Sequence, residues 1–98
     1  MSYQHTVHAN LPVAVWDEAY FSLLSLKMHL QSLPGWLGMD VTARERPAET
    51  VDVEVVTEWE GLETAIVWAQ SVRTPDAILR SLPTPPHRVT ASLGEVLS

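Results

Sequence analysis

Cysteine is absent from this 98-residue chain, and basic residues are few. Without cysteine, the protein cannot form disulfides, thiolate nucleophiles or cysteine-based zinc and iron–sulfur sites. Six Lys and Arg residues stand against twelve Asp and Glu residues, which gives a formal net charge of −6. Because nucleic-acid binding requires clustered basic side chains, we expect no nucleic-acid partner.

Long apolar runs are also lacking. No segment approaches the roughly 20 apolar residues that span a bilayer, and the amino-terminal stretch MSYQHTVHAN has no secretory-signal pattern. We therefore expect a soluble, cytoplasmic protein. A chain of 98 residues with 46% hydrophobic content fits one domain over residues 1–98. A domain of this size buries a modest core, so a partner subunit would stabilise it.

Alternating apolar and polar residues predict four strands, at residues 3–11, 37–44, 50–59 and 88–97. Apolar spacings of three and four predict a first helix capped by Asp17, with Ala19, Leu23, Leu26, Leu30 and Leu33 on its buried side. A second helix is predicted at residues 62–72, with Leu62, Ala65, Ile66 and Ala69 buried. Thr74, Pro75 and Asp76 predict the start of a third helix, in which Ile78, Leu79 and Leu82 form the apolar side.

The element order is strand, helix, strand, strand, helix, strand. It predicts an α+β, ferredoxin-like βαββαβ fold, with a four-stranded antiparallel sheet and helices on one face. For the hairpin of the second and third strands, keeping apolar residues on one face requires a loop centred on Ala48. This register pairs Ala43 with Val53, Val41 with Val55, Met39 with Thr57 and Leu37 with Trp59. It also sets Arg44 opposite Asp52, as a cross-strand ion pair.

The segments LPGWLGMDV and VVTEWEGLETAIVWAQS, together with the element order, resemble the antibiotic-biosynthesis-monooxygenase-like family over nearly the whole chain. The shared features are a Pro-Gly-aromatic-x-Gly turn at residues 34–38, Trp59 between two acids, and Trp68 in the next helix. The resemblance implies a homodimeric α/β barrel in which two sheets pack face to face. It also implies a pocket, either between sheet and helices or inside the barrel.

Haem-degrading members of this family use an Asn on the first strand, a Trp on the second helix, and a His further along as the iron ligand. Asn10 and Trp68 match the first two in position, but residues 73–82 contain no histidine. Because haem iron without an axial ligand would be poorly held, we expect no haem and no other cofactor. The four histidines show no ligand-like spacing, so we expect no metal site.

His8, Asn10 and Trp68 are the candidate site residues. His8 and Asn10 lie on the polar face of the first strand, which would turn inward if the barrel forms; in a lone sheet they would meet water. His8 could then act as a general base, because imidazole titrates near neutral pH, and Asn10 could orient an oxygen. Trp68 either covers the edge between helix and sheet or lines a pocket.

Three other residues were also considered as candidates for a role. Trp59 is predicted to lie in the core, because it ends the apolar face of its strand. His29 belongs to a polar stripe of the first helix and is predicted to lie at the surface. His5, near the amino terminus, is assigned no role.

The resemblance to this family implies a cofactor-independent, monooxygenase-like homodimer acting on a small apolar aromatic or polyketide-type molecule. In cofactor-free members of the family, the deprotonated substrate itself reduces dioxygen, so the protein has to remove a proton and exclude water. The alternative is a non-catalytic small-molecule-binding or regulatory module of ferredoxin-like fold. An RNA-recognition module shares the element order, but the charge and the lack of stacking aromatics disfavour it.

Overall fold

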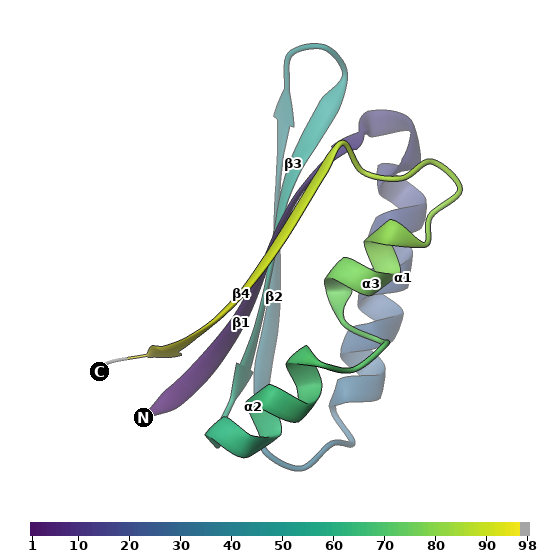
Figure 1. The fold of residues 1–98 in the computed structure, drawn as a ribbon. Helices are drawn as coiled ribbons and strands as arrows, with labels where there is room; N and C mark the ends of the chain where they lie inside the picture. The colour runs from purple at the N-terminus through teal and green to yellow at the C-terminus, as the bar shows by residue number, and fades with distance from the viewer. Residues whose placement is uncertain (97–98) are drawn as a thin grey trace.

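The computed structural model describes residues 1–96 and places four strands in one sheet with the helices on one of its faces (Figure 1). The elements are β1 (Ser2–Pro12), the 3-10 turn η1 (Val13–Val15), α1 (Trp16–Leu30), β2 (Trp36–Arg46), β3 (Thr50–Trp59), α2 (Leu62–Ala69), α3 (Pro75–Arg80) and β4 (Arg88–Val96). All neighbouring strands are antiparallel, in the order β2-β3-β1-β4. The predicted α+β fold is confirmed, while Leu97, the last residue of the predicted final strand, lies outside the described residues.

Strict alternation gives the sheet two different faces. In β3, every odd-numbered residue is buried and every even-numbered one is half-buried or exposed. The face under the helices carries Val7, Ala9, Leu11, Val51, Val53, Val55 and Trp59, all of which belong to the core. We call the uncovered face the open face; from β1 and β3 it carries Gln4, Thr6, His8, Asn10, Asp52, Glu54, Val56 and Glu58.

Helix α1 covers the sheet with the stripe that its sequence predicted. Its buried residues are Ala19, Leu23, Leu26 and Leu30. The prediction was wrong for Leu33, which lies beyond the end of the helix and is half-buried. The helix begins at Trp16, however, and its N-cap is Val15, which makes no side-chain capping bond. The predicted Asp17 cap is wrong because η1 leads the chain straight into the helix. Asp17 instead lies in the first turn, where its charge favours the helix dipole.

The two short helices complete the covering layer. In α3, Thr74 is the N-cap as predicted, since its Oγ1 accepts a 3.4 Å hydrogen bond from the backbone N–H of Ala77. Helix α2 ends at Ala69, three residues earlier than predicted. Its buried residues are Ala65 and Trp68, whereas Leu62 and Ile66 remain partly exposed. The helix therefore turns its tryptophan, rather than the expected aliphatic stripe, toward the sheet.

The β2–β3 hairpin has the predicted register over most of its length. Residues 47–49 form the loop, and Ala43 pairs with Val53 as expected. Near the other end of the hairpin, a bulge between Trp36 and Gly38 places Trp36 opposite Trp59. The predicted pairing of Leu37 with Trp59 is therefore wrong, and Leu37 is 52% exposed. The bulge lets the larger indole take the partly buried position beside Trp59.

Among residues 1–96, no helix combines the length and the apolar character that crossing a membrane requires.

Candidate functional site

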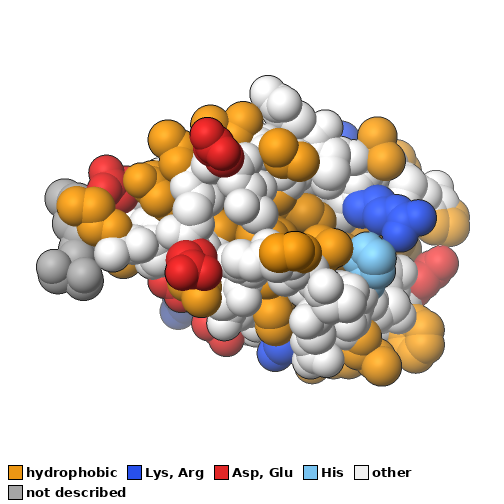
Figure 2. All heavy atoms as spheres, turned by 90° about the horizontal axis from the view of Figure 1, so that it is seen from below, with side chains coloured by type: hydrophobic (Ala, Val, Ile, Leu, Met, Phe, Trp, Pro, Cys, Tyr) orange, Lys and Arg blue, Asp and Glu red, His pale blue; other side chains and the backbone are white. Residues whose placement is uncertain are grey.

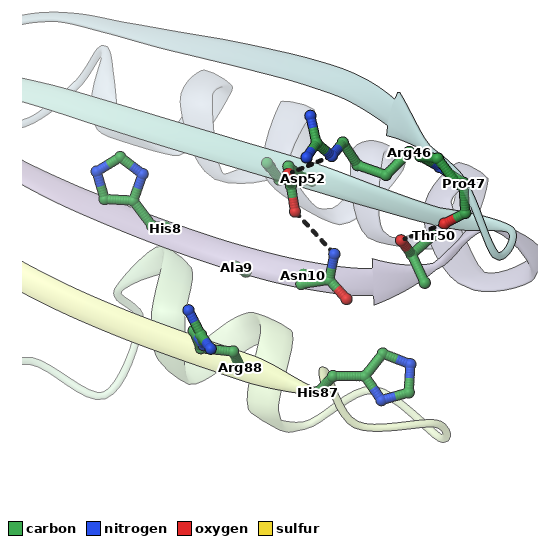
Figure 3. A pocket seen from close by; sticks show the side chains of 10 residues that line it. His8, Ala9, Asn10, Arg46, Pro47, Thr50, Asp52, His87 and Arg88 are labelled. Atoms are coloured by element: carbon green, nitrogen blue, oxygen red, sulfur yellow. Dashed lines mark hydrogen bonds and ion pairs between the residues drawn. The ribbon is translucent and has the colours of Figure 1, made fainter.

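The open face is hollowed where β1, the β2–β3 hairpin and the start of β4 meet (Figure 3). We call this concave region, of about 630 Å³, the open-face pocket. Its lining residues are His8, Ala9, Asn10, Arg46, Pro47, Thr50, Asp52, Val53, His87 and Arg88. Two of the three candidate residues, His8 and Asn10, thus lie in one depression.

A carboxylate links the two sides of the open-face pocket. Asn10 Nδ2 donates a 2.7 Å hydrogen bond to Asp52 Oδ1, and Arg46 Nε lies 3.3 Å from Asp52 Oδ2 (Figure 3). Arg44 is opposite Asp52 in the ladder, as predicted, but the ion pair is formed by Arg46, two residues further along the same face. Both partners are about half exposed, so solvent limits the pair to roughly 0.2–1 kcal/mol.

His8 lies beside a second carboxylate of the open face. Its Nδ1 is 3.5 Å from Glu54 Oε2, and the imidazole is 57% exposed. A carboxylate in this place can help to orient the ring. In a single chain, however, the ring faces solvent, as expected for a solvated sheet face.

A second, apolar pocket of about 330 Å³ lies on the helix side of the sheet, between the end of α1, α2 and the turn after α2. We call it the tryptophan pocket. Its lining residues are His29, Leu33, Pro34, Trp59, Thr64, Val67, Trp68, Ser71, Val72 and Arg73. Figure 2 views the molecule from below, the end at which α2 lies in Figure 1, and shows hydrophobic side chains gathered there, with a histidine beside a basic side chain. The chemistry of the lining suits an apolar molecule.

Trp59 and Trp68, which both line this pocket, are packed in the hydrophobic core. The Trp59 and Trp68 rings lie 5.4 Å apart at a tilt of 36°, and the two residues are 1% and 5% exposed. Trp68 Nε1 donates a 3.1 Å hydrogen bond to Thr57 Oγ1. A buried indole N–H needs such a partner, and the bond fixes the ring plane. Trp59 is in the core as predicted, and Trp68 both packs in the core and lines a pocket.

His5 is a buried residue of this region for which the sequence suggested no role. It is 3% exposed, its ring meets Trp68 edge-on at 6.4 Å, and its Nδ1 has no hydrogen-bond partner among residues 1–96. Burial lowers the pKa of His5 below its ordinary value of 6.5, and the nearby carboxylate of Asp76 partly offsets this effect. His5 lies on the same alternating face of β1 as Val7, so the sequence already indicated the covered face. This signal could have identified His5 as a buried residue.

The sheet separates the candidate residues. His8 and Asn10 are on the open face, whereas Trp68 lies under the helices, so one small molecule cannot contact all three within a chain. His29 is exposed, as predicted, but it also lines the tryptophan pocket. Within the described part of the chain, no three His, Asp or Glu side chains are grouped to hold a metal ion.

Crystal structures of monooxygenase-like proteins have this fold along the whole chain. A candidate antibiotic biosynthesis monooxygenase from Bacillus cereus matches with a TM-score of 0.73 at 14% identity, covering 100% of this chain and 93% of the other. The haem degrader MhuD from Mycobacterium tuberculosis, which has two haems bound in its active site, gives 0.63 at 20% identity, with coverages of 97% and 96%. The family resemblance inferred from the sequence is confirmed at the level of the fold.

A further match adds an observation about assembly. It is a dimeric protein of unknown function and ferredoxin-like fold from Bacteroides fragilis, with a TM-score of 0.58 at 20% identity and coverages of 97% and 96%. Neither the family models nor the curated proteins compared with the sequence give a match.

Proposed function

We propose that this protein binds a small apolar aromatic molecule in the tryptophan pocket and acts on it as a cofactor-independent, monooxygenase-like enzyme. The observation that carries the proposal is the pocket itself, about 330 Å³ in volume and floored by the indoles of Trp59 and Trp68. The lining of this space is mostly apolar, so a small aromatic molecule would be well desolvated there. The shared fold with monooxygenase-like proteins supports the same reaction class.

The reaction requires a base at the pocket. His29, in the last turn of α1, belongs to the lining, and an imidazole nitrogen can accept a proton. It would accept a proton from a phenol or enol, and the resulting anion would reduce dioxygen, which is the oxidant. If a substrate methylene becomes a carbonyl, one oxygen atom enters the product and the other leaves as water. His8 keeps a role as base only if a dimer encloses a second ligand space over the open face.

The residues around this pocket do not match those with which the haem-degrading members of the family hold haem. The resemblance expects the iron ligand beyond Trp68, where α3 instead presents Asp76, whose carboxylate pairs with Arg80 at 2.9 Å. Haem therefore has no part in the proposed reaction. A haem titration that gave a stoichiometric Soret band dependent on His29 would contradict this view.

We further propose a homodimer formed through the open face. Thr6 and Val56 are paired near its centre, and both are half-buried. Arg44, Arg46 and Arg88 lie toward its hairpin end, where Asp52 pairs with Arg46, whereas Asp40 lies opposite Val56 and Glu58 lies toward the other end. A copy placed antiparallel would set the basic end of one face over the acidic end of the other. The dimeric neighbour of the same fold supports this assembly.

Ligand binding tests the proposal, with 2-naphthol as the probe and quenching of tryptophan fluorescence as the readout. Val67 lines the pocket and is 70% exposed, so Val67→Asp places a charge in the wall without disturbing the core. We expect it to weaken binding at least about tenfold, since desolvating a carboxylate in an apolar wall costs well over 1.4 kcal/mol. Phe21→Asp, at a 73% exposed position of α1 outside the pocket lining, is the matched control and should leave binding unchanged.

Turnover separates the enzyme from the alternative. Anthrone, a tricyclic ketone that forms a phenolic enol, is the trial substrate, and oxygen uptake is the readout. Oxygen uptake that wild type shows and His29→Gln lacks would support the enzymatic function. Binding of 2-naphthol without oxygen uptake favours the non-catalytic small-molecule-binding module, and equal affinities of Val67→Asp and wild type would overturn both.

A further inference from the structure

The two edge strands of the sheet, β2 and β4, differ in how they are protected from other chains (Figure 1). An edge strand presents unpaired backbone N–H and C=O groups, which can pair with a strand of another chain. In β2, a bulge between Trp36 and Gly38 interrupts the edge, and the charged side chains of Asp40, Arg44, Glu45 and Arg46 follow along the strand. Because bulges and charges hinder such pairing, β2 is a protected edge.

Strand β4 has neither form of protection. It pairs with β1 in an unbroken register, from Ser2 opposite Val96 to Asn10 opposite Arg88. Its charged residues, Arg88 and Glu95, lie near its two ends, and the segment VTASLG between them carries no charge and no proline. Within residues 1–96, no strand lies beyond β4 in the sheet. A regular, uncharged edge of this kind can be extended by a further strand.

The helices leave this edge of the sheet largely uncovered. Of the nine residues of β4, all except Val89 and Val96 are exposed. Leu93 is 36% exposed, although it lies opposite His5 and therefore on the helix side of the sheet. A strand that approaches β4 would thus meet its backbone and short side chains rather than a helix, and it would cover Leu93.

We propose that β4 pairs with β4 of a second copy of this chain, in an antiparallel, two-fold symmetric contact that joins two sheets into one. In such a contact the same surface is used by both copies. Residues that lie opposite each other share a face of the sheet, so the helices of both copies lie on the same side. The contact uses neither the tryptophan pocket nor the open face, and it is therefore independent of the proposed function.

The side chains of β4 select the register of this contact. Placing Ala91 opposite Ala91 of the second copy sets Val89 opposite Leu93 on both sides of the two-fold axis, all on the helix side of the sheet. A shift that paired Val89 with Glu95 would oppose an apolar and a charged side chain. The preferred register also brings the acidic end of one strand, at Glu95, beside the basic end of the other, at Arg88. Because one strand pair buries little surface, we expect association at millimolar rather than micromolar concentration.

Sedimentation of the full chain tests this pairing in the Val56→Lys background, which removes the proposed open-face dimer. We expect monomers at micromolar and dimers at millimolar concentration. Ala91 is exposed, so the fold should tolerate a charge there, and circular dichroism verifies this. Adding Ala91→Lys or Ala91→Glu sets two like charges opposite each other and should abolish the millimolar dimer. An equimolar mixture of these two variants should recover it, because the opposed charges then attract.

A matched control uses the protected edge. Ala43→Lys, at an exposed position of β2 on the helix side of the sheet, should leave the millimolar association unchanged. Three results would each overturn the proposal: a Val56→Lys chain that stays monomeric at millimolar concentration, association that persists in Ala91→Lys, or a mixture that stays monomeric. Growth beyond the dimer would also contradict it, because the pairing occupies the β4 edge of both copies.

Discussion

Trp68 and Thr57 form the hydrogen bond that joins helix α2 to the sheet, with the indole Nε1 3.1 Å from the threonine Oγ1. Thr57 is fully buried, and its own hydroxyl donates a 3.4 Å hydrogen bond to the backbone carbonyl oxygen of His5. The floor of the tryptophan pocket is therefore fixed by a polar contact inside the core. A pocket floor held in this way is preorganised for a flat ligand.

Thr57→Val should test that contact. Valine keeps the shape but leaves the Trp68 N–H unpaired and buried, so we expect a loss of about 1–3 kcal/mol in the free energy of unfolding. Urea denaturation monitored by tryptophan fluorescence measures it. Val72→Thr, the reverse exchange at an 86% exposed position away from the open face, is the control and should change stability by less than about 0.5 kcal/mol. Equal effects of the two substitutions would show that the hydrogen bond contributes little.

Stability should depend on pH through His5. Because burial lowers its pKa in the folded state, the unfolded chain binds a proton in a pH range where the folded chain does not. The contribution of neutral His5 is therefore complete above pH 6.5, the ordinary value, and is lost as the pH falls toward the lowered folded value. We expect the free energy of unfolding to fall between pH 7.5 and 5.5, and to fall less in His5→Phe. A parallel pH dependence in wild type and variant would contradict this role; His87→Gln, at an exposed position, is the control.

The proposed dimer makes Val56 an interface residue at the middle of the open face. Val56→Lys would bury an ammonium group against the partner, so sedimentation at micromolar concentration should show a shift from dimer to monomer. Met28→Lys, at a 74% exposed position on α1, should remain dimeric. A monomeric wild-type protein at this concentration would remove the assembly and, with it, any enclosed role for His8.

The hairpin loop contains a position at which glycine should stabilise the protein. Ala48 has a φ of 68° and Glu49 a φ of 58°, both in the left-handed region. Since an L-residue pays about 1–2 kcal/mol in a left-handed helical conformation, Ala48→Gly should raise the free energy of unfolding by roughly 0.5–1 kcal/mol after the entropy of glycine is subtracted. Ala43→Gly in β2 should lower it instead. Destabilisation by Ala48→Gly in thermal melts would contradict the loop conformation.

Much of the fold was predictable because alternation and helical spacing report burial directly. The odd positions of β3 and the stripe of Ala19, Leu23, Leu26 and Leu30 were predicted to be buried and are buried. Local irregularities of the strands could not be predicted from these periodicities. The bulge between Trp36 and Gly38 sets Trp36 rather than Leu37 opposite Trp59, and no periodicity encodes that choice.

The candidate site was harder to predict than the fold. Alternation placed His8 and Asn10 on the polar face, yet they were grouped with Trp68 by position in the family pattern rather than by face. Because helices cover the apolar face, Trp68 belongs with His5 and Thr57. His29 was correctly predicted at the surface, but its place at a pocket depends on how α1 packs against the turn after α2, which the local sequence does not specify.

A crystal structure of the complex with 2-naphthol would test the central claim most directly, because it locates the ligand relative to the sheet. The account predicts the naphthalene ring in the tryptophan pocket, between α1 and α2. A ring bound on the open face beside His8 and Asn10, with none against Trp68, would contradict it.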